Sequence, residues 1–362
     1  MSPSASALLL FALSRALVVM VVLAAVALMP IATPCGERCH LSSVPLLDAL
    51  SRWDGEWYLG IAREGYGHAK GAQTDLAFFP LYPALMRAVG ALAGGSDDAY
   101  LAAGVLISNV ALALAAVVLA RLIALDHSRS VAIASIGLLL VFPTTVFLSA
   151  VYAESLFLLC AVAALYLART ERWPAAGIMG ALGALARPFG VLVVVPLTVE
   201  IAVRRRFSAP ALMGIALPLV AFAGWMVVLW RMTGDPLAFF TAQAAYRRQA
   251  AAPFAAISDL FDPAVYGDPF FIIGFGGLTA ILVVLSWRSL RASLAAYATV
   301  FFAAALSSGT LTSLLRYALA IFPIFVTLSV LPSPWFRRIY IVTAATSAVV
   351  FTAMFALWYW IG

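Results

Sequence analysis

The sequence has 362 residues, of which 64% are hydrophobic and only 10% are charged. A water-soluble domain carries roughly 25% charged residues, so this chain has too little polar surface to fold as a soluble globule. The net charge of +6 does not indicate nucleic-acid binding, because the basic residues stand in short gaps between apolar runs. The composition therefore predicts an integral membrane protein with no nucleic-acid partner.

The chain begins with a long apolar run over 8–30. This run is longer than the hydrophobic part of a signal peptide, and we expect it to be kept as a first membrane span. Cys35 and Cys39 follow it, and their spacing favours a local disulfide over a haem attachment site, with two free thiols as the alternative. Cys160 lies inside an apolar run and is expected to pack there as a small apolar side chain.

Ten further apolar runs predict additional membrane-spanning helices. The expected spans are 8–30, 99–120, 131–149, 152–168, 174–186, 190–203, 210–231, 270–287, 293–308, 316–331 and 339–361. Two long polar segments, 31–98 and 232–269, separate some of them, and no repeat or linker divides the chain. The sequence predicts an all-α, polytopic membrane protein with about eleven spans, folded as a single domain over 1–362.

The arginines predict the orientation of these spans. With the N-terminus in the cytoplasm, every cytoplasmic connection is basic, as the positive-inside rule requires. The arginines of these connections are Arg121, Arg129, Arg169, Arg172, Arg204, Arg205, Arg206, Arg288, Arg291, Arg337 and Arg338. Segments 31–98 and 232–269 then become outer loops. The apolar stretch 76–93 is expected to lie on the membrane surface or to be re-entrant, because a crossing there would turn the basic connections outward.

A candidate catalytic carboxylate lies in the first outer loop. If residues 46–64 form one amphipathic helix, its apolar side chains share one face and its charged side chains the other. The apolar face holds Leu46, Leu50, Trp53, Trp57 and Ile61, and the charged face holds Asp48, Arg52, Glu56 and Arg63. Asp54 projects within the apolar face, where a carboxylate is costly without a polar cavity or a partner. Asp54 is therefore a candidate catalytic base, the alternative being an aspartate held by an arginine or by backbone donors.

Other residues of the same loop share this direction or lie near it. Glu64 has an azimuth similar to that of Asp54, and Tyr58 follows Asp54 by one helical turn. Glu56 is expected to be a solvated surface residue, with a second catalytic carboxylate as the alternative.

Further polar residues fall at the outer ends of predicted spans, where ionisable groups indicate a site. Glu154 opens the fourth span, Arg187 lies between the fifth and sixth, and Arg316 and Tyr317 open the tenth. For both arginines the alternative is contact with lipid headgroups.

The second outer loop adds a pair of arginines, Arg247 and Arg248, which suits a phosphate or a lipid headgroup. The three histidines are scattered through the chain and do not indicate a metal site. There is also no glycine-rich nucleotide-binding loop, so we expect no metal and no cofactor.

Several of these stretches together resemble GPI mannosyltransferase II and its prokaryotic relatives. They are Arg-Trp-Asp-Gly-Glu-Trp-Tyr (52–58), Ile-Ala-Arg-Glu-Gly-Tyr (61–66), Phe-Phe-Pro-Leu-Tyr-Pro (78–83), Glu-Ser-Leu-Phe (154–157), Ala-Arg-Pro-Phe-Gly (186–190) and Arg-Tyr-Ala-Leu-Ala-Ile-Phe-Pro (316–323). The resemblance implies the GT-C superfamily of polyprenyl-phosphate-sugar-dependent glycosyltransferases. Such a protein is a helical bundle whose large first outer loop carries surface helices and an acidic catalytic residue.

The resemblance also implies a reaction, in which mannose passes from polyprenyl or dolichyl phosphate to an acceptor hydroxyl with inversion. Asp54 and Trp53 match the family's Trp-Asp pair, with Asp54 as the catalytic base. The residues expected to bind substrate are Trp53, Trp57, Tyr58, Glu64, Tyr66, Phe79, Tyr82, Glu154, Arg187, Arg247, Arg248, Arg316 and Tyr317.

The sequence says less about the membrane that holds the protein and about the acceptor of the sugar. The preference for Arg over Lys indicates a GC-rich bacterial genome, and hence the bacterial cytoplasmic membrane. The orientation of the loops places the active site on the outer face of that membrane. The acceptor is then a glycolipid, a cell-wall precursor or a protein. The alternatives are a transferase for another sugar and, from a different class, a secondary transporter or lipid flippase.

Overall fold

A computed structural model describes residues 3–32, 40–70, 72–246, 251–252, 255–261 and 269–361. These residues are mostly helical, and the strands described among them are the short antiparallel pair β1 (Ala69–Lys70) and β2 (Gln73–Thr74). The prediction of an all-α chain is confirmed. Cys160 is buried as expected, whereas Cys35 and Cys39 lie outside the described residues.

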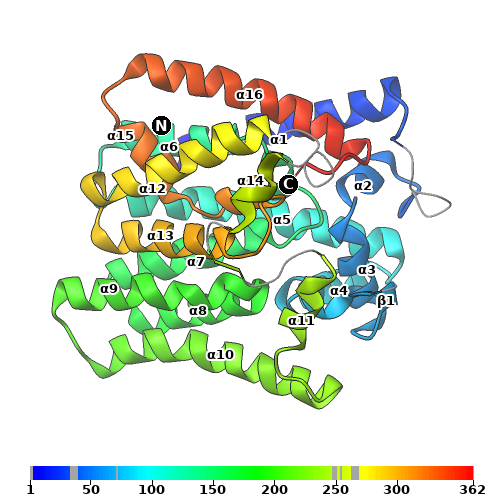
Figure 1. Ribbon diagram of the computed structural model, residues 1–362, viewed down its shortest axis with the longest axis horizontal. Helices are drawn as coiled ribbons and strands as arrows, with labels where there is room; N and C mark the ends of the chain where they lie inside the picture. Colours follow the sequence, from blue (N-terminus) through cyan, green and yellow to red (C-terminus); the bar gives the residue numbers. More distant parts are fainter. Residues whose placement is uncertain are drawn as a thin grey trace. The chain divides into compact units, whose positions relative to one another are not determined.

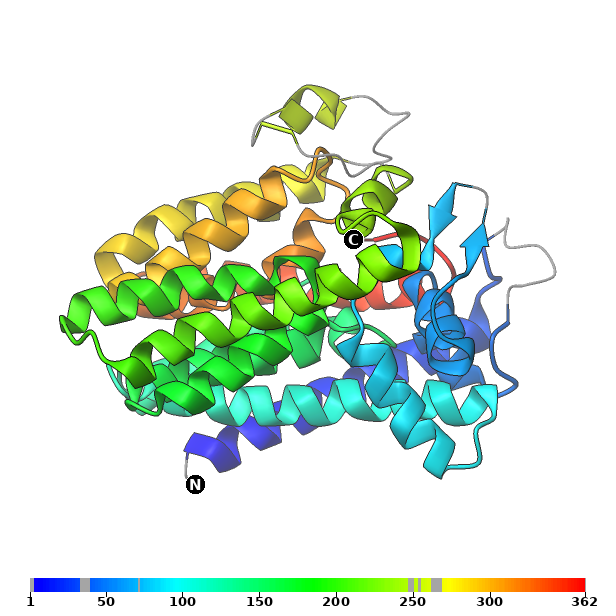
Figure 2. The same cartoon turned by 90° about the horizontal axis from the view of Figure 1, so that it is seen from below.

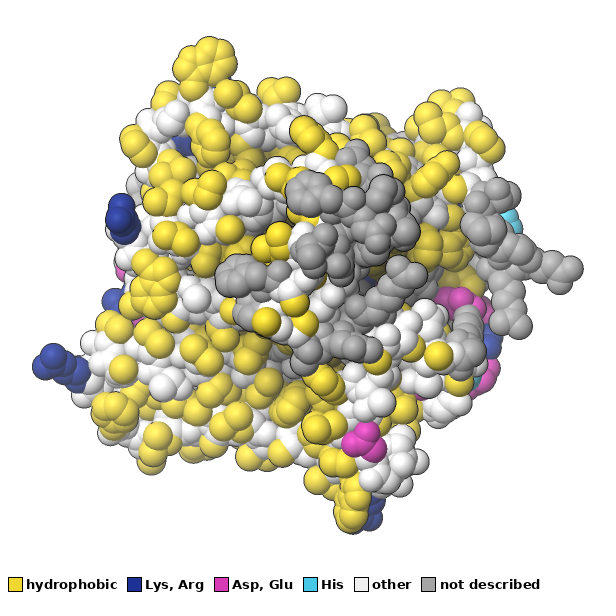
Figure 3. Space-filling view, in the orientation of Figure 1, with side chains coloured by type: hydrophobic (Ala, Val, Ile, Leu, Met, Phe, Trp, Pro, Cys, Tyr) yellow, Lys and Arg dark blue, Asp and Glu magenta, His cyan; other side chains and the backbone are white. Residues whose placement is uncertain are grey.

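Five of the described helices are long and apolar enough to cross a membrane. They are α1 (Pro3–Leu28), α5 (Asp97–Ile123), α10 (Ala209–Thr233), the continuous stretch Ile272–Ser289 and α16 (Pro334–Ala356). Figure 3 shows hydrophobic side chains over most of the described surface on one face, with charged groups near its edges. A surface of this kind is stable against lipid, so the chain is an integral membrane protein.

The predicted spans coincide with helices over most of their length, but several are interrupted. The span expected over 316–331, for example, consists of α14 (Leu314–Ala318) and α15 (Pro323–Val330) with a break between them. The count of eleven spans therefore stays a prediction. Segment 76–93 forms the 12-residue helix α4 (Leu81–Leu92), which at 1.5 Å per residue is roughly 18 Å long and too short to cross the bilayer by itself.

The described chain divides into two compact units. Unit 1 comprises Met1–His68, Phe78–Leu159 and Ser333–Ile361, and unit 2 comprises Ala69–Ala77 and Cys160–Pro332. The boundary at 159/160 falls inside helix α7 (Glu154–Arg169).

Unit 1 is built around α1, which packs against α5, α16 and α6 (Arg129–Leu140). The short helices α2 (Pro45–Leu50) and α3 (Asp54–Glu64) belong to the same unit, and α4 packs on α3 and α5 (Figures 1 and 2). Gly90 permits the close approach of α4 to α5, since a Cβ there would lie 2.4 Å from the ring of Tyr100.

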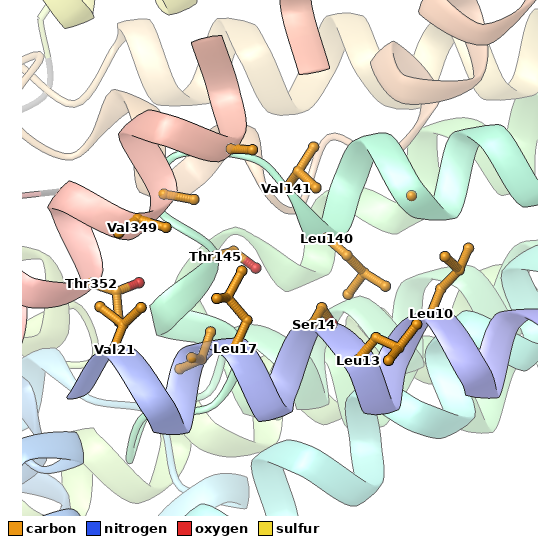
Figure 4. A pocket seen from close by; sticks show the side chains of 14 residues that line it. Leu10, Leu13, Ser14, Leu17, Val21, Leu140, Val141, Thr145, Val349 and Thr352 are labelled. Carbon is orange, nitrogen blue, oxygen red and sulfur yellow. The ribbon is translucent and has the colours of Figure 1, made fainter. Parts of the chain in front are cut away.

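A buried arginine ties α1 to the 3₁₀ turn η3 (Thr145–Leu148). The guanidinium of Arg15 donates to the carbonyl of Thr145 at 3.1 Å, to the hydroxyl of Thr145 at 2.8 Å and to the hydroxyl of Ser149 at 3.0 Å. Beside this contact, α1, α6 and α16 enclose a groove of about 240 Å³, whose lining is almost entirely apolar (Figure 4). The charge of Arg15, which lies inside the apolar helix α1, is therefore stabilised by oxygen acceptors of the protein and not by solvent.

Unit 2 contains the remaining helices. They are η2 (Asp75–Ala77), α8 (Trp173–Ala186), η4 (Pro188–Val193), α9 (Val194–Arg204), α10, α11 (Ala238–Ala244), η5 (Ala255–Phe261), the π-helix η6 (Ile272–Gly276), α12 (Gly277–Ser289), α13 (Ala292–Leu306), α14 and α15. Helices α8 and α10 lie side by side (Figure 1). Their backbones approach closely because α8 carries glycines at the contact; a Cβ on Gly180 would lie 2.7 Å from Pro218.

The loops that connect these helices are held by one buried carboxylate. Glu200 of α9 accepts from Arg204 at 2.7 Å, from Arg291 at 2.8 Å and from Ser293 at 2.8 Å, and Arg169 lies 3.5 Å away. The side chain of Glu200 is fully buried. Three of the arginines that the charge pattern placed in connections on one membrane face therefore converge on the same acidic residue.

We expect Glu200→Gln to lower the free energy of unfolding by about 3 kcal/mol or more, because it removes the charge of a fully buried carboxylate from three partly buried arginines. Thermal unfolding of the detergent-solubilised protein measures this. Glu171→Gln is the control, since Glu171 pairs with Arg204 and Arg206 on the surface and its loss is expected to cost under about 1 kcal/mol. Equal shifts in the two variants would contradict the structural role given to Glu200.

Candidate active site

The chain turns sharply between α2 and α3, and Asp54 is the first residue after the turn. Residues 51–53, here called the corner, separate the two helices, and Trp53 adopts φ 60° and ψ −110°. A non-glycine residue in this region costs of order 1–3 kcal/mol and persists only where its surroundings hold it. Asp54 is half-buried, and a carboxylate at the first position of a helix interacts favourably with the free N–H groups there.

The expectation of one continuous helix over 46–64 is therefore wrong. The break at the corner changes the environment of Asp48 and Arg52, which were expected on a solvated face and are instead buried, with 4% and 1% exposure. They form an ion pair at 2.8 Å, and Asp48 also accepts from His40 at 2.8 Å. Burial lowers the pKa of Arg52, while the carboxylate of Asp48 acts to raise it.

A tyrosine fixes the backbone on both sides of Trp53. The buried hydroxyl of Tyr152 donates to the carbonyl of Arg52 at 3.1 Å and accepts from the backbone N–H of Asp54 at 3.1 Å. The backbone N–H of the preceding Val151 donates to the carbonyl of Leu50 at 2.9 Å. Sequence reasoning missed Tyr152, although it stands only two residues before Glu154, which the sequence did single out.

The aromatic residues predicted to bind substrate pack together beneath the corner. Trp57, Tyr58, Phe79 and Tyr82 are all buried. Trp57 stacks on Phe78 with ring centroids 6.0 Å apart, and Tyr58 packs edge-on against Tyr82 at 4.9 Å. This set of buried rings, here called the floor, comes from α3, from the segment before α4 and from α4 itself. The apolar face expected for α3 therefore packs on protein.

Two polar groups belong to this floor. The hydroxyl of Tyr82 bonds to the carbonyl of Gly104 at 2.9 Å and to Ser108 at 2.8 Å. Burial raises the pKa of Tyr82 well above its usual value, with the nearby charge of Glu154 adding to the effect. Tyr82 therefore stays protonated, and Glu154, 2% exposed at the start of α7, is a buried carboxylate near it.

The remaining predicted residues of this loop lie further along the chain. Glu64 is exposed at the end of α3 and bonds to His68 and to Arg63, both at 2.6 Å. The hydrogen bond from His68, followed by that from Arg63, lowers the pKa of Glu64. The hydroxyl of Tyr66 donates to the carbonyl of Phe78 at 2.9 Å.

In unit 2 the structure brings Arg187 together with Arg316 and Tyr317, which are neighbours in the sequence but lie far along the chain from Arg187. The guanidinium groups of Arg187 and Arg316 lie 5.3 Å and 5.9 Å from the ring centroid of Tyr317. Phe189 packs edge-on against the same ring at 5.9 Å. Arg316 is 5% exposed. Two cations on one aromatic ring form an arrangement suited to an anion such as a phosphate.

Arg247 and Arg248 lie outside the described residues. Within the part of the chain that the structure describes, no three His, Cys, Asp or Glu side chains are grouped so that they could hold a metal ion.

Comparisons with known proteins bear on this arrangement. The family model described as "Mannosyltransferase (PIG-V)" matches residues 5–247, which is more than half of the chain. No curated protein matches the sequence at a significant level.

Two similar solved structures come from Archaeoglobus fulgidus. One is its oligosaccharyltransferase tethered with an acceptor peptide (TM-score 0.45, 15% identity), and the other is its oligosaccharyltransferase AglB with an inhibitory peptide and a dolichol-phosphate (TM-score 0.46, 14% identity). Each similarity covers 95% of this chain and 55% of the other, so the chain spans about half the length of the proteins it matches.

The family match includes the corner, Asp54 and the floor beneath it, and also reaches Arg187. The apolar helices and the family together define the class of protein. The chain belongs to the mannosyltransferase (PIG-V) family and is an integral membrane protein.

Proposed function

We propose that this enzyme transfers mannose from a polyprenyl-phosphate donor to an acceptor hydroxyl with inversion, and that Asp54 is the general base. The observation that carries the proposal is the corner itself. A half-buried carboxylate follows a strained tryptophan whose two backbone neighbours are bonded to one buried tyrosine hydroxyl. Strain held in this way is concentrated at functional sites.

The chemistry requires few groups. The acceptor oxygen attacks C1 of the mannose from the face opposite the phosphate, the bond from C1 to the phosphate oxygen breaks, and Asp54 takes the hydroxyl proton. The leaving polyprenyl phosphate is already a stable anion and needs cations more than an acid. Arg187 and Arg316 on the ring of Tyr317 are the proposed phosphate ligands.

Trp53 is the proposed partner of Asp54 in binding. Its indole N–H is buried and has no hydrogen-bond acceptor among the described residues, so it is a donor available to a substrate oxygen once the site is filled. An acceptor hydroxyl held by both residues would be oriented for attack.

The donor class rests on the apolar character of the protein and on the family. A lipid-linked sugar reaches a site in a bundle of apolar helices from within the bilayer, and the sequence has no glycine-rich loop for a nucleotide sugar. A transporter or flippase is the less supported function, because the family is one of enzymes. The proposed sugar is mannose, because the family is described as one of mannosyltransferases. The proposed acceptor is a glycolipid, a cell-wall precursor or a protein.

We expect Asp54→Asn to lower kcat by about 10²- to 10⁴-fold, the range for loss of a general base, with an unchanged melting temperature. The measurement is transfer of radiolabelled mannose from polyprenyl-phosphate-mannose to a panel of lipid, glycan and peptide acceptors by the purified protein. Glu56→Gln, two residues further in the same helical turn, is the matched control and should retain wild-type kcat. Near-wild-type activity of Asp54→Asn would remove Asp54 from the mechanism.

Arg187→Gln and Arg316→Gln test the phosphate ligands separately from the base. Each is expected to weaken product inhibition by polyprenyl phosphate and to lower kcat/KM for the donor by roughly 10- to 100-fold, as for a lost charged hydrogen bond. Arg231→Gln is the control, because Arg231 is exposed at the end of α10. An unchanged inhibition constant in both variants would exclude these arginines as phosphate ligands.

We further propose that the corner faces the non-cytoplasmic side of a bacterial cytoplasmic membrane. After replacement of the native cysteines by alanine, Ser43→Cys, which is exposed near the start of α2, should react with a membrane-impermeant maleimide on intact cells. Arg206 is 69% exposed and lies in a connection that the charge pattern places in the cytoplasm. Arg206→Cys should therefore react only after the membrane is opened. The reverse labelling would place Asp54 in the cytoplasm and end the proposed orientation.

A further inference from the structure

The segment after α16, residues 357–361, contacts the corner through two tryptophans. The ring of Trp53 packs edge-on against Trp358 with centroids 5.6 Å apart, and against Trp360 at 5.3 Å. The strained residue is thus held between two indole rings from the end of the chain. Edge-to-face pairs of this kind are directional, so they fix the ring of Trp53 as well as bury it.

The same segment also holds Arg52, the residue before Trp53. Its Nε donates to the carbonyl of Ala356 at 3.3 Å, and its guanidinium lies 5.0 Å from the centroid of the Trp358 ring. The two residues that immediately precede Asp54 therefore have the end of the chain as a common neighbour. This set of contacts is independent of the hydrogen bonds made by Tyr152.

The segment is itself fixed in place. Trp358, like Trp53, is a non-glycine residue with positive φ, here 69°, and the carbonyl of Leu357 accepts from the N–H of Ala32 at 2.9 Å. Trp360 packs against Phe147 with centroids 6.2 Å apart. Two strained backbone positions, at Trp53 and Trp358, are thus packed directly on each other, and each needs the surrounding contacts to persist.

The position of the Asp54 carboxylate depends on this packing, because Asp54 follows Trp53 directly. If the indole contacts are lost, the corner can relax towards a common backbone conformation, and the carboxylate moves with it. The match to the mannosyltransferase family ends at residue 247, so it assigns nothing to this segment. We infer that Trp358 and Trp360 are positioning residues for Asp54, an inference that rests on the proposed role of Asp54 as the base.

The test is steady-state kinetics of Trp358→Leu and Trp360→Leu in the full-length protein, normalised to folded enzyme. Misplacement of a base by about 1 Å can cost roughly 10²-fold, so we expect kcat to fall about 10- to 100-fold while KM for donor and acceptor changes less than about 2-fold. Trp358→Phe, which keeps an aromatic ring, should recover most of the lost kcat. A purely structural role would lower the melting temperature and the folded fraction without this split between kcat and KM.

Tyr359→Leu is the matched control, because Tyr359 lies between the two tryptophans and its side chain is 48% exposed. It should keep wild-type kcat. Wild-type kcat in both tryptophan variants, or equal losses in Trp358→Phe and Trp358→Leu, would overturn the inference. Asp54→Asn, measured in parallel, separates the two claims: if it is inactive while the tryptophan variants are fully active, only the positioning role fails, and if it is active, the proposed base fails.

Discussion

The hydroxyl of Tyr152 bridges the carbonyl of Arg52 and the N–H of Asp54, and the geometry of the candidate site depends on this bridge. Between the two bonded groups lies Trp53, in a backbone conformation that an isolated chain would leave. One side chain just before α7 thereby fixes where α2 stops and where α3 starts. Together with the packing of Trp358 and Trp360 on Trp53, it holds the break between the two helices, so that Asp54 begins α3.

The buried charge of Arg52 at the corner also depends on partners that the fold supplies. Arg52 gives up hydration and receives in return the carboxylate of Asp48, a backbone carbonyl and the face of Trp358. In an apolar protein such a group is stable only where these partners are supplied together. Arg52 is thus a buried cation whose charge is balanced by the neighbouring carboxylate of Asp48.

Glu200 shows how differently a carboxylate behaves when several arginines surround it. It joins residues from α9, α13 and the loops next to them, and the charge pattern places those loops on one membrane face. Asp54, by contrast, stands at the start of a short helix and is half-exposed. The first arrangement favours stability, and the second suits the role of general base that we propose for Asp54.

The membrane character, the helical class and the family stretches could be predicted from the residues alone, because long apolar runs and local motifs are recognised without any tertiary contact. The sequence also pointed to Asp54, Arg187, Arg316 and Tyr317. Only the tertiary structure showed the break at 51–53, the burial of Asp48 and Arg52, and the contacts of Tyr152, Trp358 and Trp360. The physical reason is that hydrophobic periodicity assumes a continuous helix, whereas the positive φ of Trp53 is imposed by partners about 100 and 300 residues away along the chain.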